Sequence, residues 1–420
     1  MAHSLPASLP FSLAGDSTIP DVPDPIVIPD GELIEPFTRV EHLTRFQRRM
    51  FEDGLCATHE RRITIDVLHL NGDHAGTLGL VAMDGQLVVT KPAADAVART
   101  LTLNFVDTDR TLDFSPTSPG ENVFFDRMIR VHDNRYIPSL GWVSTAIFTG
   151  PVQTFRRNGS EVELTAHGKE RLAMQSQWSP TTLHKGMHKV AAIRKLLADT
   201  GETEFDFPNL PDRGNRLPEK KSLDRFGTPW AVAQKIARSM NRQLYYDGHG
   251  VCRLRKHPER TSFHFEGGDG GSVLSEPDVT RDLSDFHNVW LVLGKKPKGA
   301  KHRAHKVVRI PPSHPLSPES LGRSGSPRVL AEKIEDSSLR SQQECRRVGE
   351  QHMRDAIRGT VAASFEAVPI PHLTEGDLHV LSLSHSSVQF RLWEFTLPLA
   401  GASMSVGSVK RTPRRHGRRG

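Results

Sequence analysis

The stretch PVQTFRRNGSEVELTAHG (151–168) contains two short runs of strand-like residues with a tight turn between them. Val, Thr and Phe favour the pleated, half-buried surface of a β-sheet. Asn158 and Gly159 separate the two runs, and this dipeptide is the preferred composition of a type I′ turn. The stretch therefore predicts a β-hairpin, with one strand in PVQTFRR and the other in SEVELTAHG.

A strand with one apolar face is also predicted upstream, in RRITIDVLHL (61–70). Its first apolar residues alternate with polar ones, as a half-buried strand requires; they are Ile63, Ile65 and Val67. Leu68 and Leu70 then break the alternation. We expect this strand to be bulged, or buried on both faces, at that point.

Further strand-like runs lie around these two. Asp84 and Gly85 separate AGTLGLVAM from GQLVVT and predict a second hairpin. The other runs are ARTLTLNFVD (98–107), ENVFFDRMIRVHD (121–133) and GWVSTAIFTG (141–150). Regular short strands with turn signals between them are typical of a β-barrel or β-sandwich.

The pattern changes to helical near residue 168. GKERLAMQS (168–176) is helix-like, and HKGMHKVAAIRKLLADTG (184–201) has its apolar residues along one stripe. TPWAVAQKIARSM (228–240) predicts a helix capped by Thr228 with proline at its first position. NRQLYYDGHGVCRLRK (241–256) follows, and its composition predicts two short strands joined by the turn DGHG.

A second β region begins with FHNVWLVLGKK (286–296). RSQQECRRVGEQHMRDAIRG (340–359) predicts a helix, although Gly349 in its middle is unfavourable. Strands return in TVAASFEAVPI, GDLHVLSLS, SVQFRLWEFTLP and GASMSVGSVKR. The chain therefore predicts a β region, an α+β region and another β region, in that order.

Charge is unevenly distributed along the 420 residues, whose net formal charge is +6. Residues 1–38 contain six acidic residues and no Lys or Arg, whereas residues 410–420 contain six basic residues and no acid. The body between them is only mildly basic, which argues against a uniformly basic nucleic-acid surface. The proline-rich acidic arm has little to bury, so we expect it to order only against a partner.

Cysteine content and the N-terminal sequence indicate the compartment. Cys56, Cys252 and Cys345 are the only cysteines, and none lies in a CxxC pair. This predicts neither a disulfide framework nor a zinc module, and favours assembly in a reducing cytoplasm. The N-terminus lacks a basic region ahead of an apolar run, and no segment approaches the ~18 apolar residues of a membrane span. We therefore expect no signal peptide and no stable membrane association.

Two motifs resemble ligand sites, but each has a simpler interpretation. EGGDGGS (266–272) is glycine-rich enough to cradle a phosphate, but no helix signal and no Lys-Ser/Thr follow it, so a loop is the simpler interpretation. His184 and His188 lie four residues apart on a predicted helix, where a metal ion could bridge them. No third ligand is indicated nearby, so a solvated helix face is favoured.

Two further groups of residues are of types that can act in catalysis. Glu202, Glu204 and Asp206 could supply paired carboxylates for glycoside hydrolysis, but their alternation predicts an edge strand with a polar face. His249 and Cys252 could form a nucleophilic pair, yet the hairpin interpretation makes Cys252 a buried core residue. No standard catalytic motif occurs, so we predict no catalytic residue, no cofactor and no metal.

The basic tail is a candidate electrostatic contact through its arginines, Arg411, Arg414, Arg415, Arg418 and Arg419. They could neutralise nucleic-acid phosphates. No aromatic residue is interleaved for base stacking, however. A disordered solubilising tail, or one that docks on an acidic partner such as the arm of the chain itself, is an equally good interpretation.

The order of the segments resembles one known family. VSTAIFTGPVQTFRRNGSEVELTAHGKERLAM is followed by AVAQKIARSMN and RQLYYDGHGVCRLRK, then by DLSDFHNVWLVLG, VPIPHLTEGDLHVLS and FRLWEFTLPLAGASMSVGSVKR. Over about residues 55–410 this series is similar to the tail hub, or baseplate hub, proteins of tailed bacteriophages, which are often labelled minor tail proteins. Their order and spacing, rather than any single motif, carry the resemblance.

The resemblance implies an α+β, mainly β fold with two β-barrel domains like those of the tail tube. With the arm and the tail, it divides the chain into an extended acidic arm (1–40), a first barrel (41–175), an α+β accessory domain (176–285), a second barrel (286–410) and a disordered basic tail (411–420). No hydrolase domain is visible after the second barrel.

The resemblance also implies a non-enzymatic structural role in the virion, at the tail tip, after assembly in the host cytoplasm. Three copies would form a pseudo-sixfold ring that joins the tail tube to the tip and lines the channel for passing DNA. The implied partners are the distal tail protein, the tape measure protein and tip or fibre proteins. The alternatives are a tail-associated cell-wall hydrolase, acting through the cluster at Glu202 or through His249 and Cys252, and a nucleic-acid-binding protein acting through the basic tail.

Overall fold

A computed structural model provides the structure of the chain. It describes residues 38–57, 59–78, 82–107, 127–175, 180–212, 214–223, 227–281, 286–296, 302–322, 325–336, 339–359, 361–383 and 386–407. Strands hold 43% and helices 17% of the structure, so the prediction of a mainly β fold with some helix is confirmed. The described strands form one large sheet and four small ones.

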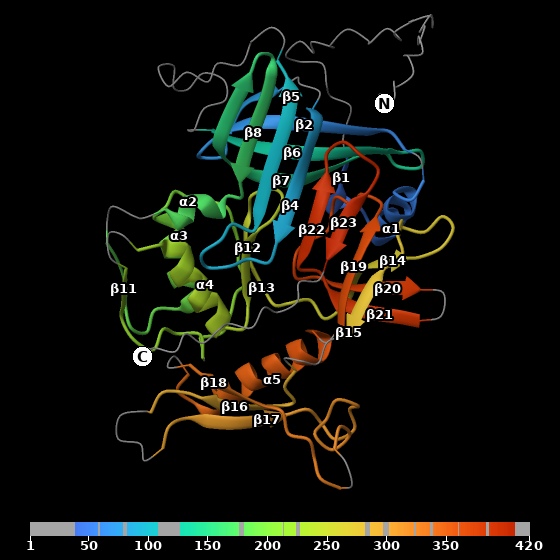
Figure 1. Ribbon diagram of the computed structural model, residues 1–420. Helices are drawn as coiled ribbons and strands as arrows, with labels where there is room; N and C mark the ends of the chain where they lie inside the picture. The colour runs from blue at the N-terminus through green and yellow to red at the C-terminus, as the bar shows by residue number, and fades with distance from the viewer. Residues whose placement is uncertain are drawn as a thin grey trace, which may run out of the picture. The chain divides into compact units, whose positions relative to one another are not determined.

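The large sheet combines strands from both ends of the chain (Figure 1). Its N-terminal strands are β1 (Thr38–Arg39), β2 (Arg61–His69), β3 (His74–Leu78), β4 (Ala82–Thr90), β5 (Arg99–Val106), β6 (Arg127–Ile137), β7 (Gly141–Asn158) and β8 (Glu161–His167). Its C-terminal strands are β15 (Asp278–Arg281), β19 (Val361–Ala367), β22 (Glu394–Pro398) and β23 (Met404–Gly407). The two groups join where β22 pairs antiparallel with β4, with Leu397 opposite Leu87.

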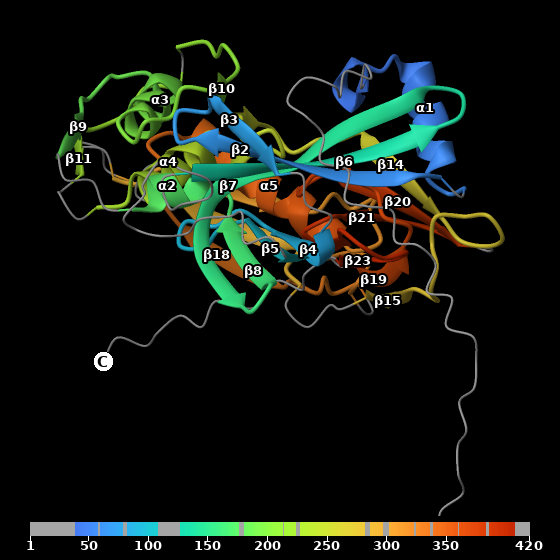
Figure 2. The same cartoon turned by 90° about the horizontal axis from the view of Figure 1, so that it is seen from above.

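Strand β7 links two parts of this sheet (Figure 2). One part contains β6, β2 and β3, and the other continues through β8, β5 and β4. Its residues up to Pro151 pair with β6, and its residues from Val152 onward pair with β8. Gly150 lies at the crossing, where a Cβ atom would be 1.9 Å from the His167 carbonyl oxygen. The two strands predicted at 141–150 and 151–157 are therefore one continuous strand.

The β7–β8 hairpin lies where it was predicted, but its turn differs. Asn158 pairs with Glu161, so Gly159 and Ser160 form the loop. Gly159 has a φ of 63°, whereas Asn158 and Ser160 are not in the left-handed region. Since a type I′ turn needs positive φ at both central residues, the predicted turn type is wrong.

The alternation predicted for β2 is confirmed, and its register shifts between Val67 and Leu68 at the expected bulge. The hairpin predicted at Asp84-Gly85 is wrong, because both residues lie inside β4. A Cβ atom on Gly85 would approach the Thr102 carbonyl oxygen to 2.7 Å. Glycine is present here because neighbouring backbones come close, and not because the chain turns.

A helical region with its own core follows β8. Its elements are α2 (Glu170–Met174), β9 (Thr181–Leu183), α3 (Lys189–Ala198), β10 (Phe205–Asp206), β11 (Lys221–Leu223), α4 (Pro229–Ser239), β12 (Gln243–Tyr246) and β13 (Cys252–Arg255). The predicted hairpin is confirmed, because β12 and β13 pair antiparallel with Tyr246 opposite Cys252. Buried Trp230 of α4 stacks on Tyr246 and ties the helices to this hairpin.

A third core lies between one helix and one small sheet. The sheet contains β16 (Val289–Leu293), β17 (His305–Arg309) and β18 (Ala331–Glu335), and the helix is α5 (Gln342–Gly359). Trp290 and Cys345 are buried between them. A Cβ atom on Gly349 would lie 2.5 Å from Cγ2 of Val308, so the glycine within α5 lets the helix lie close to β17.

The remaining elements complete the main core. They are η1 (Val40–His42), α1 (Arg45–Gly54), β14 (Thr261–Glu266), β20 (Leu378–Leu383) and β21 (Ser386–Arg391). Phe265 of β14 and Phe390 of β21 pack with Phe365 of β19, so this small sheet shares the core of the large one. Thr44 caps α1 in a reciprocal arrangement with Gln47.

The expected pair of closed barrels is not confirmed. Among the described residues, the pairing order of the large sheet ends at β15 on one side and β3 on the other. The strands of the two β regions share one core, whereas 286–357 build a separate one. The domain boundaries set out above remain a prediction.

Candidate functional site

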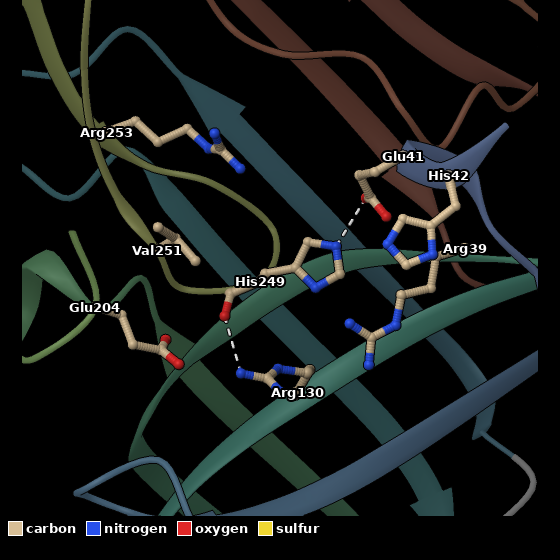
Figure 3. Close-up of a pocket in the computed structure, with 8 residues that line it drawn as sticks. All are labelled: Arg39, Glu41, His42, Arg130, Glu204, His249, Val251 and Arg253. Atoms are coloured by element: carbon tan, nitrogen blue, oxygen red, sulfur yellow. Dashed lines mark hydrogen bonds and ion pairs between the residues drawn. The ribbon is translucent and has the colours of Figure 1, made fainter. Parts of the chain in front are cut away.

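A polar pocket of about 260 Å³ lies where β1 and η1 approach β6 and the turn between β12 and β13 (Figure 3). It is lined by Arg39, Glu41, His42, Arg130, Glu204, His249, Val251 and Arg253. We call it the Arg39 pocket. Three guanidinium groups and two imidazoles stand against two carboxylates, so the lining has an excess of basic groups.

Glu41 and His249 form the central contact of the pocket. Nε2 of His249 lies 2.8 Å from Oε1 of Glu41. Burial alone would raise the pKa of Glu41, but the hydrogen bond and charge of His249, with the charge of Arg39, lower that pKa below its ordinary value. Glu41 therefore stays ionised at neutral pH.

Arg130 is held in place by the turn between β12 and β13. Its Nη2 donates to the His249 carbonyl oxygen at 2.9 Å, and its Nε donates to Thr149 Oγ1 at 3.1 Å. Thr149 in turn donates to the Gly248 carbonyl oxygen at 2.8 Å. A Cβ atom on Gly248 would be 1.9 Å from the Ala146 carbonyl oxygen, so only glycine lets this turn lie against β7.

The other two arginines of the pocket differ in their partners. Arg253 donates to Asp247 at 2.5 Å and also contacts Asp206. Burial would lower the pKa of Arg253, but the hydrogen bond and charge of Asp247 raise it overall. Arg39 is exposed on β1, and its side chain makes no hydrogen bond and no ion pair with any residue that the structure describes.

The proposed His249–Cys252 pair is not formed. His249 belongs to the Arg39 pocket, whereas Cys252 is buried in the helical core, on the same face of β13 as Leu254. Burial foremost, with the nearby Glu202 charge, raises the pKa of the Cys252 thiol well above its ordinary value. Since the thiolate is the nucleophile, this environment disfavours nucleophilic chemistry.

The three acidic residues after α3 differ in burial, and Lys169 Nζ lies within 4 Å of both Glu202 and Glu204. Glu202 is buried; its Oε1 accepts from Lys169 Nζ at 3.0 Å and from the backbone N–H groups of Thr203 and Glu204. Glu204 and Asp206 are exposed, the first in the pocket and the second on Arg253. The predicted polar strand face is therefore wrong for Glu202, which forms a buried ion pair.

The prediction that His184 and His188 lie on one helix is wrong, so they share no helix face. Helix α3 begins only at Lys189; His188 is its cap and His184 lies in the preceding turn region. Across the described residues, no group of three or more His, Cys, Asp or Glu side chains is placed to hold a metal ion.

The glycine-rich segment and the basic tail are the two remaining predicted features. EGGDGGS begins at the last residue of β14 and continues as turns with positive φ at Gly268 and Gly270, and no helix follows it. The basic tail lies outside the described residues, with its arginines Arg411, Arg414, Arg415, Arg418 and Arg419.

None of the helices in the described part of the chain is long and apolar enough to cross a membrane.

A buried charge network was missed from the sequence. Arg99 Nη2 of β5 lies 2.8 Å from Glu375 Oε2, and both side chains are almost completely buried. Arg255 of β13 pairs with Asp377 at 2.8 Å, and Gln243 of β12 donates to the Glu375 carbonyl oxygen. The network ties the segment before β20 to both the large sheet and the helical region. Sequence spacing gives no signal for it, because its members come from three distant segments: β5, the β12–β13 hairpin and residues 375–377.

No protein-family model and no curated protein matches this sequence. Several solved structures match its fold, among them three tail proteins. The 43 kDa tail protein of prophage MuSo2 from Shewanella oneidensis has a TM-score of 0.55 and 10% identity, covering 84% of this chain and 98% of that one. The tail protein from Neisseria meningitidis MC58 has a TM-score of 0.54 and 11% identity, covering 82% and 95%. Prophage tail protein gp18 from Listeria monocytogenes EGD-e has a TM-score of 0.50 and 9% identity, covering 83% and 95%. The chain therefore has the fold of these tail proteins, two of which come from prophages.

Proposed function

We propose that this chain, which has the fold of prophage tail proteins, is a structural component of a bacteriophage-type tail. The observation that carries the proposal is the extent of the match. It covers more than four fifths of this chain and nearly the whole of each tail protein. The similarity is therefore to the entire architecture and not to one widely shared domain.

Within the tail, we propose the position of the hub at the tip. Three copies would form a pseudo-sixfold ring that joins the tube to the tip and lines the channel for DNA. The support for this position is that each chain supplies two groups of strands, one from each half of the sequence, as two positions per subunit in such a ring would require. The distal tail protein, the tape measure protein and tip or fibre proteins would be its neighbours in the virion, after assembly in the host cytoplasm.

We propose that the role is non-enzymatic. Most side chains considered as catalysts have another use in the fold: Glu202 pairs with Lys169, Asp206 pairs with Arg253, and Cys252 packs in the helical core. His249 pairs with Glu41 at the surface. These arrangements support packing and binding rather than bond cleavage.

Native mass spectrometry of the purified full chain tests the ring. We expect a species of three copies of the 46.7 kDa chain, alone or with a neighbouring tail protein. A strictly monomeric chain in the presence of its tail partners would overturn the proposed ring. Zymography on peptidoglycan tests the non-enzymatic role, and clearing by the wild type that Glu202→Gln abolishes would contradict it.

A further inference from the structure

Two guanidinium groups of the Arg39 pocket, those of Arg39 and Arg130, form no ion pair within 4 Å with any described carboxylate, although the charge of Arg39 acts on Glu41. Arg253 is neutralised by Asp206 and Asp247. Among the described residues, the Arg130 side chain hydrogen-bonds to the Thr149 hydroxyl and to one backbone carbonyl, and the Arg39 side chain has no hydrogen-bonding partner. The pocket thus has unused hydrogen-bond donors and positive charge.

Arg130 is already oriented for a ligand. Two of its nitrogens are fixed by β7 and by the turn after β12, which leaves Nη1 available. Figure 3 shows Arg39 entering the same space from β1, beside the Glu41–His249 contact. A planar guanidinium binds a carboxylate through two parallel hydrogen bonds, and a group held beforehand loses less freedom on binding.

The size and charge of the pocket limit the ligand. At about 260 Å³ it is smaller than the roughly 300–1,000 Å³ typical of small-molecule sites, but it can take one acidic side chain. Val251 is its only aliphatic lining residue. Glu41 and Glu204 would repel a phosphate of charge near −2, whereas a singly charged carboxylate matches the modest excess of basic groups.

We propose that the Arg39 pocket binds a carboxylate side chain of an acidic peptide segment presented by a neighbouring protein subunit. This inference rests on the proposed function, because a tail assembly would provide the neighbouring subunit. The guanidinium groups of Arg39 and Arg130 would bind the carboxylate, and Arg39 would reach it from the exposed strand β1.

A peptide of residues 14–36 is a suitable probe, because it carries all six acidic residues of the arm and no Lys or Arg. The host is the full chain with the same six positions changed to Asn or Gln, which removes competition within the chain. Fluorescence anisotropy of the labelled peptide should show saturable binding. Arg39→Glu should weaken it about tenfold or more, and Arg39→Lys should weaken it less.

Arg309→Glu is the matched control, because Arg309 is exposed on β17 and its side chain makes, among the described residues, a single 3.6 Å ion pair with Glu319. It makes the same charge change outside the pocket and should leave peptide affinity unchanged. Equal affinity in the Arg39→Glu and Arg309→Glu chains would overturn the proposal. Tighter, Arg39-dependent binding of single-stranded DNA would also overturn it, by assigning the pocket to phosphate. A chain that forms trimers but fails this test would contradict the pocket proposal alone.

Discussion

Gly150→Ala tests whether β7 crosses between the two parts of the large sheet as closely as the structure shows. The new Cβ atom would be 1.9 Å from the His167 carbonyl oxygen and 2.8 Å from the His167 carbonyl carbon. Since carbon–oxygen contacts lie near 3.3 Å, β7 and the end of β8 would have to separate by more than about 1 Å. Overpacking of this kind costs about 1–3 kcal/mol, and a disturbed ladder hydrogen bond adds about 1 kcal/mol. We expect a loss of about 3 kcal/mol in the free energy of unfolding.

Urea unfolding followed by circular dichroism measures this loss. Gly76→Ala is the matched control, because Gly76 is also a strand glycine, has nothing within 4 Å of an added Cβ atom, and lacks a positive φ. Removing glycine there restricts only the unfolded chain and should change stability by less than about 1 kcal/mol. If Gly150→Ala is as stable as Gly76→Ala, the close crossing is refuted.

Three other predictions concern buried groups. Arg99→Ala should destabilise the chain by about 3–5 kcal/mol in chemical unfolding, because it leaves the Glu375 carboxylate buried and unpaired; changing both residues to Met should cost much less. Burial lowers the pKa of His379 to about 3. Between about pH 6.5 and pH 3 only the unfolded chain protonates this histidine, so the free energy of unfolding should decline as the pH falls through that range. Calorimetry against pH should show a smaller decline in His379→Phe. Iodoacetamide should modify half-buried Cys56 in the folded chain while leaving buried Cys252 unmodified, and rapid modification of Cys252 would contradict its place in the core.

Local patterns predicted the parts of the fold that local chemistry controls. Alternation located β2 and β5, and the composition around DGHG located the β12–β13 hairpin. Thr228 and Pro229 marked the start of α4 correctly, because proline is tolerated at the first turn of a helix. In each case the residues that give the signal belong to the element that they predict, or are its immediate neighbours in the sequence.

Long-range contacts decided the features that were missed. Pairing of β22 with β4 joins segments some 300 residues apart, so no local pattern could predict a sheet shared by both β regions. Gly85 and Gly150 resemble turn residues in the sequence, yet each is a glycine because another backbone passes close by. The Arg39 pocket was missed for the same reason, since its lining comes from β1, β6 and the β12–β13 turn.

Immunogold labelling of purified phage-type particles that contain this chain tests the central claim most directly. An antibody against the full chain should place gold at the end of the tail distal to the capsid. Labelling confined to the capsid, or particles with normal tails that lack the chain, would contradict a structural role at the tail tip.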